Sequence, residues 1–144
     1  MMSYEKLDVY KVAMEFLALA LQIAKLLPLG YSDLSDQLKR AAMSAPQNIG
    51  EGAGKRTAAD CRKYFDNARG SAMECGVHLD ICAADNLVDP AMIQHGKELL
   101  EREVAMLTRL SQNQGKRTAA NSKLHQGVKV TANTADQSRR PRDA

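Results

Sequence analysis

The amino-acid sequence predicts an all-α protein, an up-down-up-down antiparallel four-helix bundle with a disordered basic C-terminal tail. Apolar residues recur every three or four positions over four long segments, which is the spacing of one face of a helix. The connections between these segments are short, and short connections favour antiparallel neighbours. Aromatic residues make up only 4% of the 144 residues and Trp is absent, whereas β-sandwiches and barrels rely on aromatic and β-branched side chains. The composition therefore argues against an all-β fold.

The first two helices are expected over residues 7–27 and 32–49. The first ends at Leu27-Pro28-Leu29-Gly30, because a proline disfavours helix in the residue before it. The second starts near Ser32-Asp33, which can cap it. Its apolar face is mostly alanine, so a neighbouring helix can approach closely.

The third helix is expected to start at Thr57-Ala-Ala-Asp60, after Gly50, Gly52 and Gly54 have ended the second. This tetrapeptide has the spacing of a capping box, with Asp in place of the usual Glu or Gln. The fourth helix starts at Asp89-Pro90, an N-cap followed by proline at the first helical position.

After Gln114 the apolar period is lost, and residues 115–144 predict a flexible basic tail beyond a bundle of residues 1–114. The bundle holds 13 Lys and Arg against 15 Asp and Glu, a net charge of −2, while the tail holds 7 against 2, a net charge of +5. The hexapeptide of residues 54–59 recurs verbatim at residues 115–120. Six residues are too few to indicate a duplicated domain.

The glycine-rich stretch from Gly50 to Thr57 resembles a phosphate-binding loop only superficially. Ile49 stands where the first glycine of that loop belongs, and Arg56 stands where its hydroxyl residue belongs. No strand precedes the stretch. A glycine-rich helix end is the better interpretation.

Cys75, His78, Cys82 and Asp85 share one side of the third helix and could converge on a metal ion. Cys75 and Cys82 also lie on the apolar stripe, where buried thiols are the simpler interpretation. No His forms a recognisable catalytic spacing with a Ser or Cys. We therefore expect no enzymatic activity, no cofactor and no bound metal.

The sequence predicts a cytoplasmic protein that does not enter membranes. It contains no run of ~18 apolar residues. Its N-terminus lacks the basic-then-apolar order of a signal peptide. Three cysteines, an odd number, suit a reducing compartment better than a disulfide framework.

A polar stripe runs beside the predicted core on the second and third helices. It comprises Gln37, Arg40, Ser44, Asn48 and Glu51 on the second helix, and Asn67, Ser71, Glu74, His78 and Asp85 on the third. Folding the hairpin places Arg40 opposite Glu74, so we predict an ion pair between them, partly buried between the helices or at a subunit contact. The alternative is two independent solvated faces.

The predicted topology also sorts charge between the two ends of the bundle. Lys55, Arg56, Arg62, Lys63, Arg109, Lys116 and Arg117 map to one end, with Lys6 nearby, and Asp33, Asp36, Asp80, Asp85 and Asp89 map to the other. The basic end predicts salt-dependent contacts with phosphates. No aromatic cluster interleaves these cations, so binding should be directed at the nucleic-acid backbone. Solubility charge on exposed helix ends is the alternative.

Two stretches carry a family resemblance. The runs Gln37-Leu-Lys-Arg-Ala-Ala-Met-Ser44 and Pro46-Gln-Asn-Ile-Gly-Glu-Gly52 resemble the signature of the bacterial four-helix-bundle proteins encoded by 23S ribosomal RNA intervening sequences. Ala68-Arg-Gly-Ser-Ala-Met-Glu74 is similar to the third-helix motif of that family. The sequence departs at Ala45 and Gly50, where isoleucine and alanine are usual. The long basic tail is not typical of the family.

The resemblance implies a homopentameric, barrel-like assembly without enzymatic activity. The family is related to the accessory variability protein (Avd) of diversity-generating retroelements, whose basic barrel surface binds nucleic acid and a reverse transcriptase. The expected partners are therefore other copies of the chain, structured RNA or RNA/DNA, and a reverse transcriptase. Glu51 and Gly52 match the signature and are interpreted as structural. The alternative function is a protein-only adaptor ring that recruits its partner through helix faces.

Overall fold

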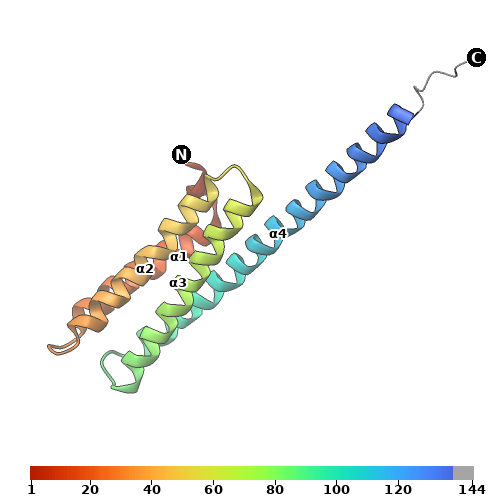
Figure 1. Cartoon of the computed structure of the whole chain (residues 1–144). Coiled ribbons are helices and arrows are strands. Elements are labelled where there is room, and N and C mark those ends of the chain that lie inside the picture. Colours follow the sequence, from red (N-terminus) through yellow and green to blue (C-terminus); the bar gives the residue numbers. More distant parts are fainter. Residues whose placement is uncertain (138–144) are drawn as a thin grey trace, which may run out of the picture.

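The computed structural model describes the backbone of residues 1–137 and the side chains of residues 1–126. The elements are a 3-10 turn η1 (Ser3–Lys6) and four helices, α1 (Asp8–Leu26), α2 (Ser32–Ala53), α3 (Ala58–Ala84) and α4 (Pro90–Gln137). The helices run alternately up and down (Figure 1). Each of α1 and α3 contacts both α2 and α4, so the helices follow one another around the bundle in chain order. The predicted all-α four-helix fold is confirmed.

The predicted start signals of α3 and α4 are confirmed. The Thr57 hydroxyl oxygen accepts a hydrogen bond from the Asp60 backbone N–H at 3.2 Å. The Asp89 carboxylate accepts one from the Ala91 N–H at 2.9 Å, immediately before Pro90 opens α4. Both bonds satisfy backbone donors that a helix start leaves free.

The prediction that three glycines end α2 is wrong for two of them. Gly50 and Gly52 lie inside the helix, which continues to Ala53, and only Gly54 stands at its end. A Cβ atom on Gly52 would lie 2.9 Å from Cε1 of Phe65, whose side chain is buried. Gly52 therefore lets α3 approach closely rather than terminating α2.

The core consists of two apolar clusters stacked along the bundle. One holds Phe16, Ile23, Leu38 and Leu79 with their neighbours. The other surrounds Phe65 with Val9, Ile49 and Leu107. The buried face of α2 is rich in alanine, as the sequence predicts, with Ala41, Ala42 and Ala45 all buried.

The structure differs from the sequence prediction after Gln114, because α4 continues as a helix to Gln137. We call residues 115–137 the α4 extension. It projects past the other three helices (Figure 1), and the side chains of residues 116–126 are exposed. Residues 115–126 include Lys, Arg, Ala and Gln, which favour helix without packing, and no proline. The part of the predicted tail from 138 to 144 lies outside the described residues.

Candidate nucleic-acid interface

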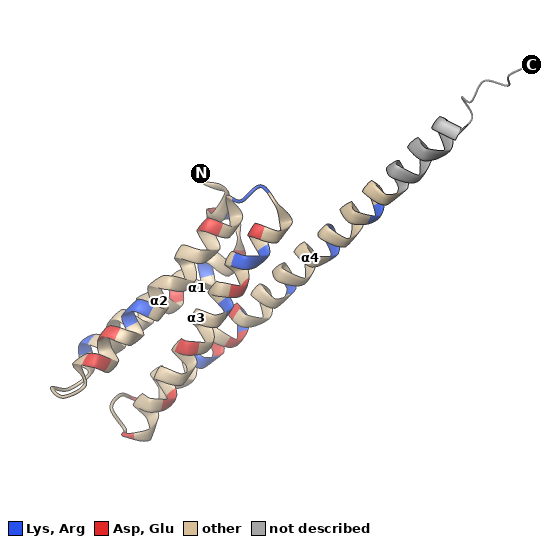
Figure 2. Ribbon diagram, in the orientation of Figure 1, with Lys and Arg blue, Asp and Glu red and all other residues tan. Residues whose placement is uncertain are grey.

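The predicted basic residues gather at the end of the bundle where α1 begins, α2 connects to α3 and α4 leaves the other helices (Figure 2). We call this end the basic pole, and it comprises Lys55, Arg56, Arg62, Lys63, Arg109, Lys116 and Arg117. The first two lie at the α2–α3 connection, the next two in the first turns of α3, and the last three on α4.

Two of these cations already have acidic partners. The Lys55 ammonium lies 3.6 Å from the Glu51 carboxylate, and Nε of Arg62 lies 3.8 Å from Asp66. Within the part of the chain that the structure describes, the other cations of the basic pole form no ion pair with Asp or Glu. The pole therefore keeps positive charge available to an outside anion.

Tyr64 lies beside the basic pole and was not predicted from the sequence. Its ring lies below the ammonium groups of Lys55 and Lys63, 4.9 and 5.7 Å from the ring centroid, as cation–π contacts. Lys55 reaches the ring from the α2–α3 connection, whereas Lys63 is its neighbour on α3. The adjacency of Lys63 and Tyr64 in the sequence was the available signal.

A groove of about 480 Å³ separates the first turns of α3 from the α4 extension. We call it the basic groove, and it is lined by Ala59, Arg62, Lys63, Asp66, Gly115, Thr118, Ala119 and Ser122. Both copies of the repeated hexapeptide contribute to it, the first through Ala59 and the second through Gly115, Thr118 and Ala119. A Cβ on Gly115 would lie 3.0 Å from Nη1 of Arg62, so glycine lets that guanidinium rest against α4.

Arg109 lies apart from the basic groove. It lines a separate hollow of about 410 Å³ with Lys6, between the start of α1 and α4. The predicted residues are therefore brought to one end of the molecule but distributed over more than one side of it.

The opposite end is less purely acidic than the sequence prediction implies. Lys39 lies 3.5 Å from Asp36, and Lys97 lies 2.6 Å from Asp80. Asp85 accepts a hydrogen bond from the Tyr31 hydroxyl. The two lysines partly neutralise Asp36 and Asp80, which makes the charge separation between the two ends incomplete.

The predicted ion pair between Arg40 and Glu74 is not formed in the single chain. Both side chains line one depression of about 280 Å³ between α2 and α3, so the predicted juxtaposition is present. Both residues are exposed rather than partly buried. The Glu74 carboxylate instead lies 3.5 Å from Nε2 of His78, one turn along its own helix. The i,i+4 spacing supplies that partner without crossing between helices.

Other members of the polar stripe do meet across α2 and α3. The Ser71 hydroxyl donates to the Ser44 hydroxyl oxygen at 2.9 Å. The Asn48 amide donates to the Ser44 carbonyl at 2.9 Å and to its hydroxyl oxygen at 3.1 Å. The Ser71–Ser44 bond joins the two helices, and the two Asn48 bonds lie within α2, at residues that carry the family resemblance.

A sequence model of the 23S rRNA-intervening sequence protein family matches residues 5–109, well over half of the chain. The chain belongs to this family. A search of curated proteins found no match. The family match ends within α4 at Arg109, so the α4 extension and half of the basic groove lie beyond it.

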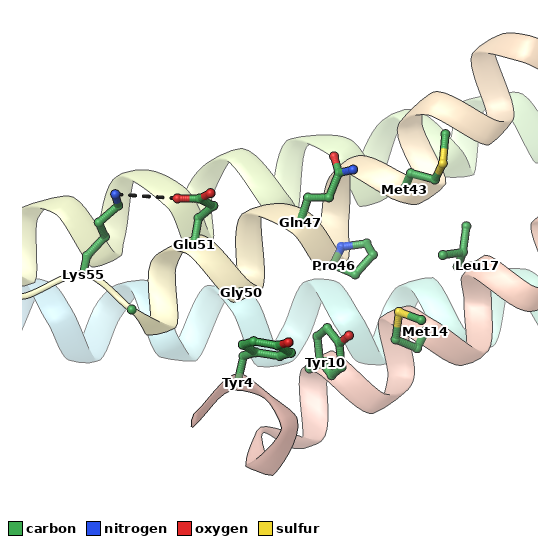
Figure 3. Close-up of a pocket in the computed structure, with 11 residues that line it drawn as sticks. Tyr4, Tyr10, Met14, Leu17, Met43, Pro46, Gln47, Gly50, Glu51 and Lys55 are labelled. Atoms are coloured by element: carbon green, nitrogen blue, oxygen red, sulfur yellow. Dashed lines mark ion pairs between the residues drawn. The ribbon is translucent and has the colours of Figure 1, made fainter. Parts of the chain in front are cut away.

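This intervening-sequence protein carries a second kind of surface, two hollows lined by partly exposed apolar side chains on opposite sides of the bundle. The α1/α2 hollow, of about 690 Å³, is lined mainly by Tyr4, Tyr10, Met14, Leu17, Met43 and Pro46 (Figure 3). The α3/α4 hollow, of about 420 Å³, includes Met73, Gly76, Val77, Leu100 and Val104. Met73 and Val77 are 53% and 56% exposed, and Ile81 continues their row at 44%. Contiguous exposed apolar patches are more common at interaction surfaces than on the rest of a protein surface.

The cysteines of this family member are core side chains. Cys61, Cys75 and Cys82 are buried free thiols. Burial, together with the nearby Glu103 charge, raises the pKa of Cys75 to about 12, so that thiol stays protonated. No group of three or more His, Cys, Asp or Glu suited to a metal ion occurs among the residues described, including the set around His78.

Glu103 is a buried ionisable residue that the sequence analysis missed. It is 0% exposed, and neither carboxylate oxygen has a hydrogen-bond partner within the described structure. Desolvation raises the pKa of Glu103 to about 8. Its position four residues after Leu99 and four before Leu107, both buried, was the signal that placed it on the core face.

None of the helices, over residues 1–137, combines the length and the apolar character needed to cross a lipid bilayer.

Proposed function

We propose that this chain is a non-enzymatic, oligomeric scaffold that binds structured RNA or RNA/DNA through its basic pole. The observation that carries the proposal is the set of cations at that pole that lack acidic partners among the described residues. Such cations can neutralise phosphates without first breaking an internal ion pair. The family description, which names a sequence intervening in 23S rRNA, supports an RNA-related role.

The oligomeric part of the proposal rests on the two apolar hollows. They lie on opposite sides of the bundle, so one copy can present its α3/α4 hollow to the α1/α2 hollow of the next. Five copies, and a reverse transcriptase as protein partner, are supported by the resemblance to the retroelement accessory proteins. A ring would repeat the basic pole around one rim.

The test is a titration of the full chain with a structured RNA hairpin across a range of salt. We expect log K to fall linearly with log salt, and Arg56→Ala combined with Lys63→Ala to reduce the slope by about 2. Lys25→Ala combined with Lys39→Ala at the other end is the matched control and should leave the slope unchanged. If log K does not change with log salt, or if the chain does not bind the hairpin at ~50 mM salt, the proposal that it binds nucleic acid is wrong.

The exposed apolar hollows also favour a second candidate, a protein-only adaptor ring that recruits its partner through helix faces. The ratio of absorbance at 260 and 280 nm of the purified protein separates the two candidates. Copurifying nucleic acid supports the scaffold. A protein free of nucleic acid that binds no hairpin supports the adaptor.

A further inference from the structure

We infer that the basic groove, between the first turns of α3 and the α4 extension, binds the sugar-phosphate backbone of a nucleic acid. The inference rests on the proposed function and deepens it, because it assigns the phosphate contacts to one groove on one side of the basic pole. Half of that groove is built by residues beyond the family match.

The floor of the groove is open because its residues are small. Ala59 from α3 faces Gly115, Thr118 and Ala119 from α4, and none of these side chains fills the space between the helices. Gly115 allows the Arg62 guanidinium to lie against α4, because a Cβ there would be 3.0 Å from Nη1. The backbone of a nucleic-acid strand can therefore approach both helices closely.

The charges around the groove favour an anion. Arg62 and Lys63 line it from α3, and the α4 extension carries Lys116, Arg117 and Lys123. The sequence contains no Asp or Glu between Glu103 and Asp136. The one acidic residue in the groove, Asp66, is engaged by Arg62 at 3.8 Å and by the Ser111 hydroxyl at 2.5 Å.

The chemistry of the groove argues against a protein helix or a lipid surface as its occupant. Over residues 115–126, Leu124 is the one large apolar side chain, so this stretch offers no apolar seam to a coiled-coil partner. With so few apolar side chains, residues 115–126 also lack the apolar face that a helix needs to enter a membrane interface. Small residues flanked by cations match a phosphodiester backbone, which needs charge and close approach but no apolar pocket.

The test fills the groove without changing its charge. Ala119→Trp places an indole in the groove, whereas Ala120→Trp, about 100° further around the same exposed helix, is the matched control outside it. We expect Ala119→Trp to weaken binding of a structured RNA hairpin about tenfold or more, since contacts to several phosphates are lost, and Ala120→Trp to change it less than about twofold. Thermal unfolding followed by circular dichroism checks that both variants are folded.

Three results overturn the inference. If Ala119→Trp leaves hairpin binding unchanged, while Arg56→Ala combined with Arg109→Ala weakens it, the groove is not the binding site but the proposed function stands. Both of those arginines lie outside the groove lining. Equal weakening by both tryptophan variants assigns the effect to the extension in general. Tighter binding of the wild-type protein to phosphatidylglycerol vesicles than to the hairpin assigns the groove to a lipid surface. If the wild-type chain binds no hairpin at low salt, the proposed function itself fails.

Discussion

Glu103 places a carboxyl group where water does not reach it, in the stripe of α4 that also holds Leu99 and Leu107. The pKa of Glu103 is raised from 4.5 to about 8 by burial. Above pH ~4.5 the unfolded chain releases this proton while the folded chain retains it until about pH 8. The contribution of Glu103 to stability is therefore most favourable below pH ~4.5 and falls as the pH rises towards 8.

We predict that Glu103→Gln removes this pH dependence. Relative to the variant, the free energy of unfolding of the wild-type protein should fall by about 1.4 kcal/mol per pH unit, or about 3 kcal/mol in total by pH 7. Urea unfolding at several pH values between 5 and 8 measures the difference, and all other titrating groups are shared by the two proteins. Parallel stability profiles would show that Glu103 ionises normally in the folded chain.

Single residues also show where sequence interpretation reaches its limit. The juxtaposition of Arg40 and Glu74 could be predicted from helix periodicity, but the partner of Glu74 could not, because His78 offers a nearer contact on the same helix. The position of Tyr64 beneath two lysines depends on the path of the α2–α3 connection. Such contacts depend on three-dimensional paths that a linear pattern does not encode.

At the scale of the elements, the glycines of α2 and α3 serve different purposes. Gly52 faces α3, and a Cβ there would lie 2.9 Å from the buried ring of Phe65 and 3.1 Å from Cβ of Tyr64. Gly70, inside α3, is exposed and has no atom within 4 Å of the corresponding position. We expect Gly52→Ala to lower the free energy of unfolding by about 1–3 kcal/mol through overpacking.

Gly70→Ala is the matched control and should raise the free energy of unfolding by about 0.5–1 kcal/mol, because alanine restricts the unfolded chain. Chemical denaturation of both variants makes the comparison. A stabilised Gly52→Ala variant would mean that α2 and α3 do not pack as closely as the structure shows.

Most element boundaries could be predicted from local chemistry. The Thr57 hydroxyl and the Asp89-Pro90 pair mark helix starts through hydrogen bonds to residues two or three positions further along, so they do not depend on the tertiary fold. The α4 extension could not, because its exposed residues have no apolar period, and an exposed helix without that period resembles an unstructured segment in sequence. Gly52 was misinterpreted for a related reason, since a glycine that ends a helix and one that admits a neighbour look alike in sequence.

At the scale of the whole molecule, the positions of the two apolar hollows determine the kind of assembly to expect. The α1/α2 and α3/α4 hollows lie on opposite sides of the bundle and differ in their residues. A contact between unlike surfaces is heterologous, and repeating it builds a closed ring when the rotation permits. A contact between like surfaces would stop at a two-fold dimer.

We predict that Met14→Glu in the α1/α2 hollow and Val77→Glu in the α3/α4 hollow each reduce the proposed assembly to monomers of 15.8 kDa. A carboxylate in either hollow would have to be desolvated at the contact. Gln22→Glu, on the exposed surface of α1 outside the hollow, is the control and should leave the assembly intact. Light scattering coupled to size-exclusion chromatography measures the masses.

Mixing the two monomeric variants distinguishes the two kinds of contact. The Val77→Glu protein keeps an intact α1/α2 hollow, and the Met14→Glu protein keeps an intact α3/α4 hollow. If the contact joins unlike surfaces, an equimolar mixture forms one good contact and stops at a heterodimer, whereas each variant alone stays monomeric. If like surfaces meet, one of the variants dimerises by itself and the mixture adds nothing. The heterodimer is expected, because only a contact between unlike surfaces can continue around a ring and carry the basic pole to a common rim.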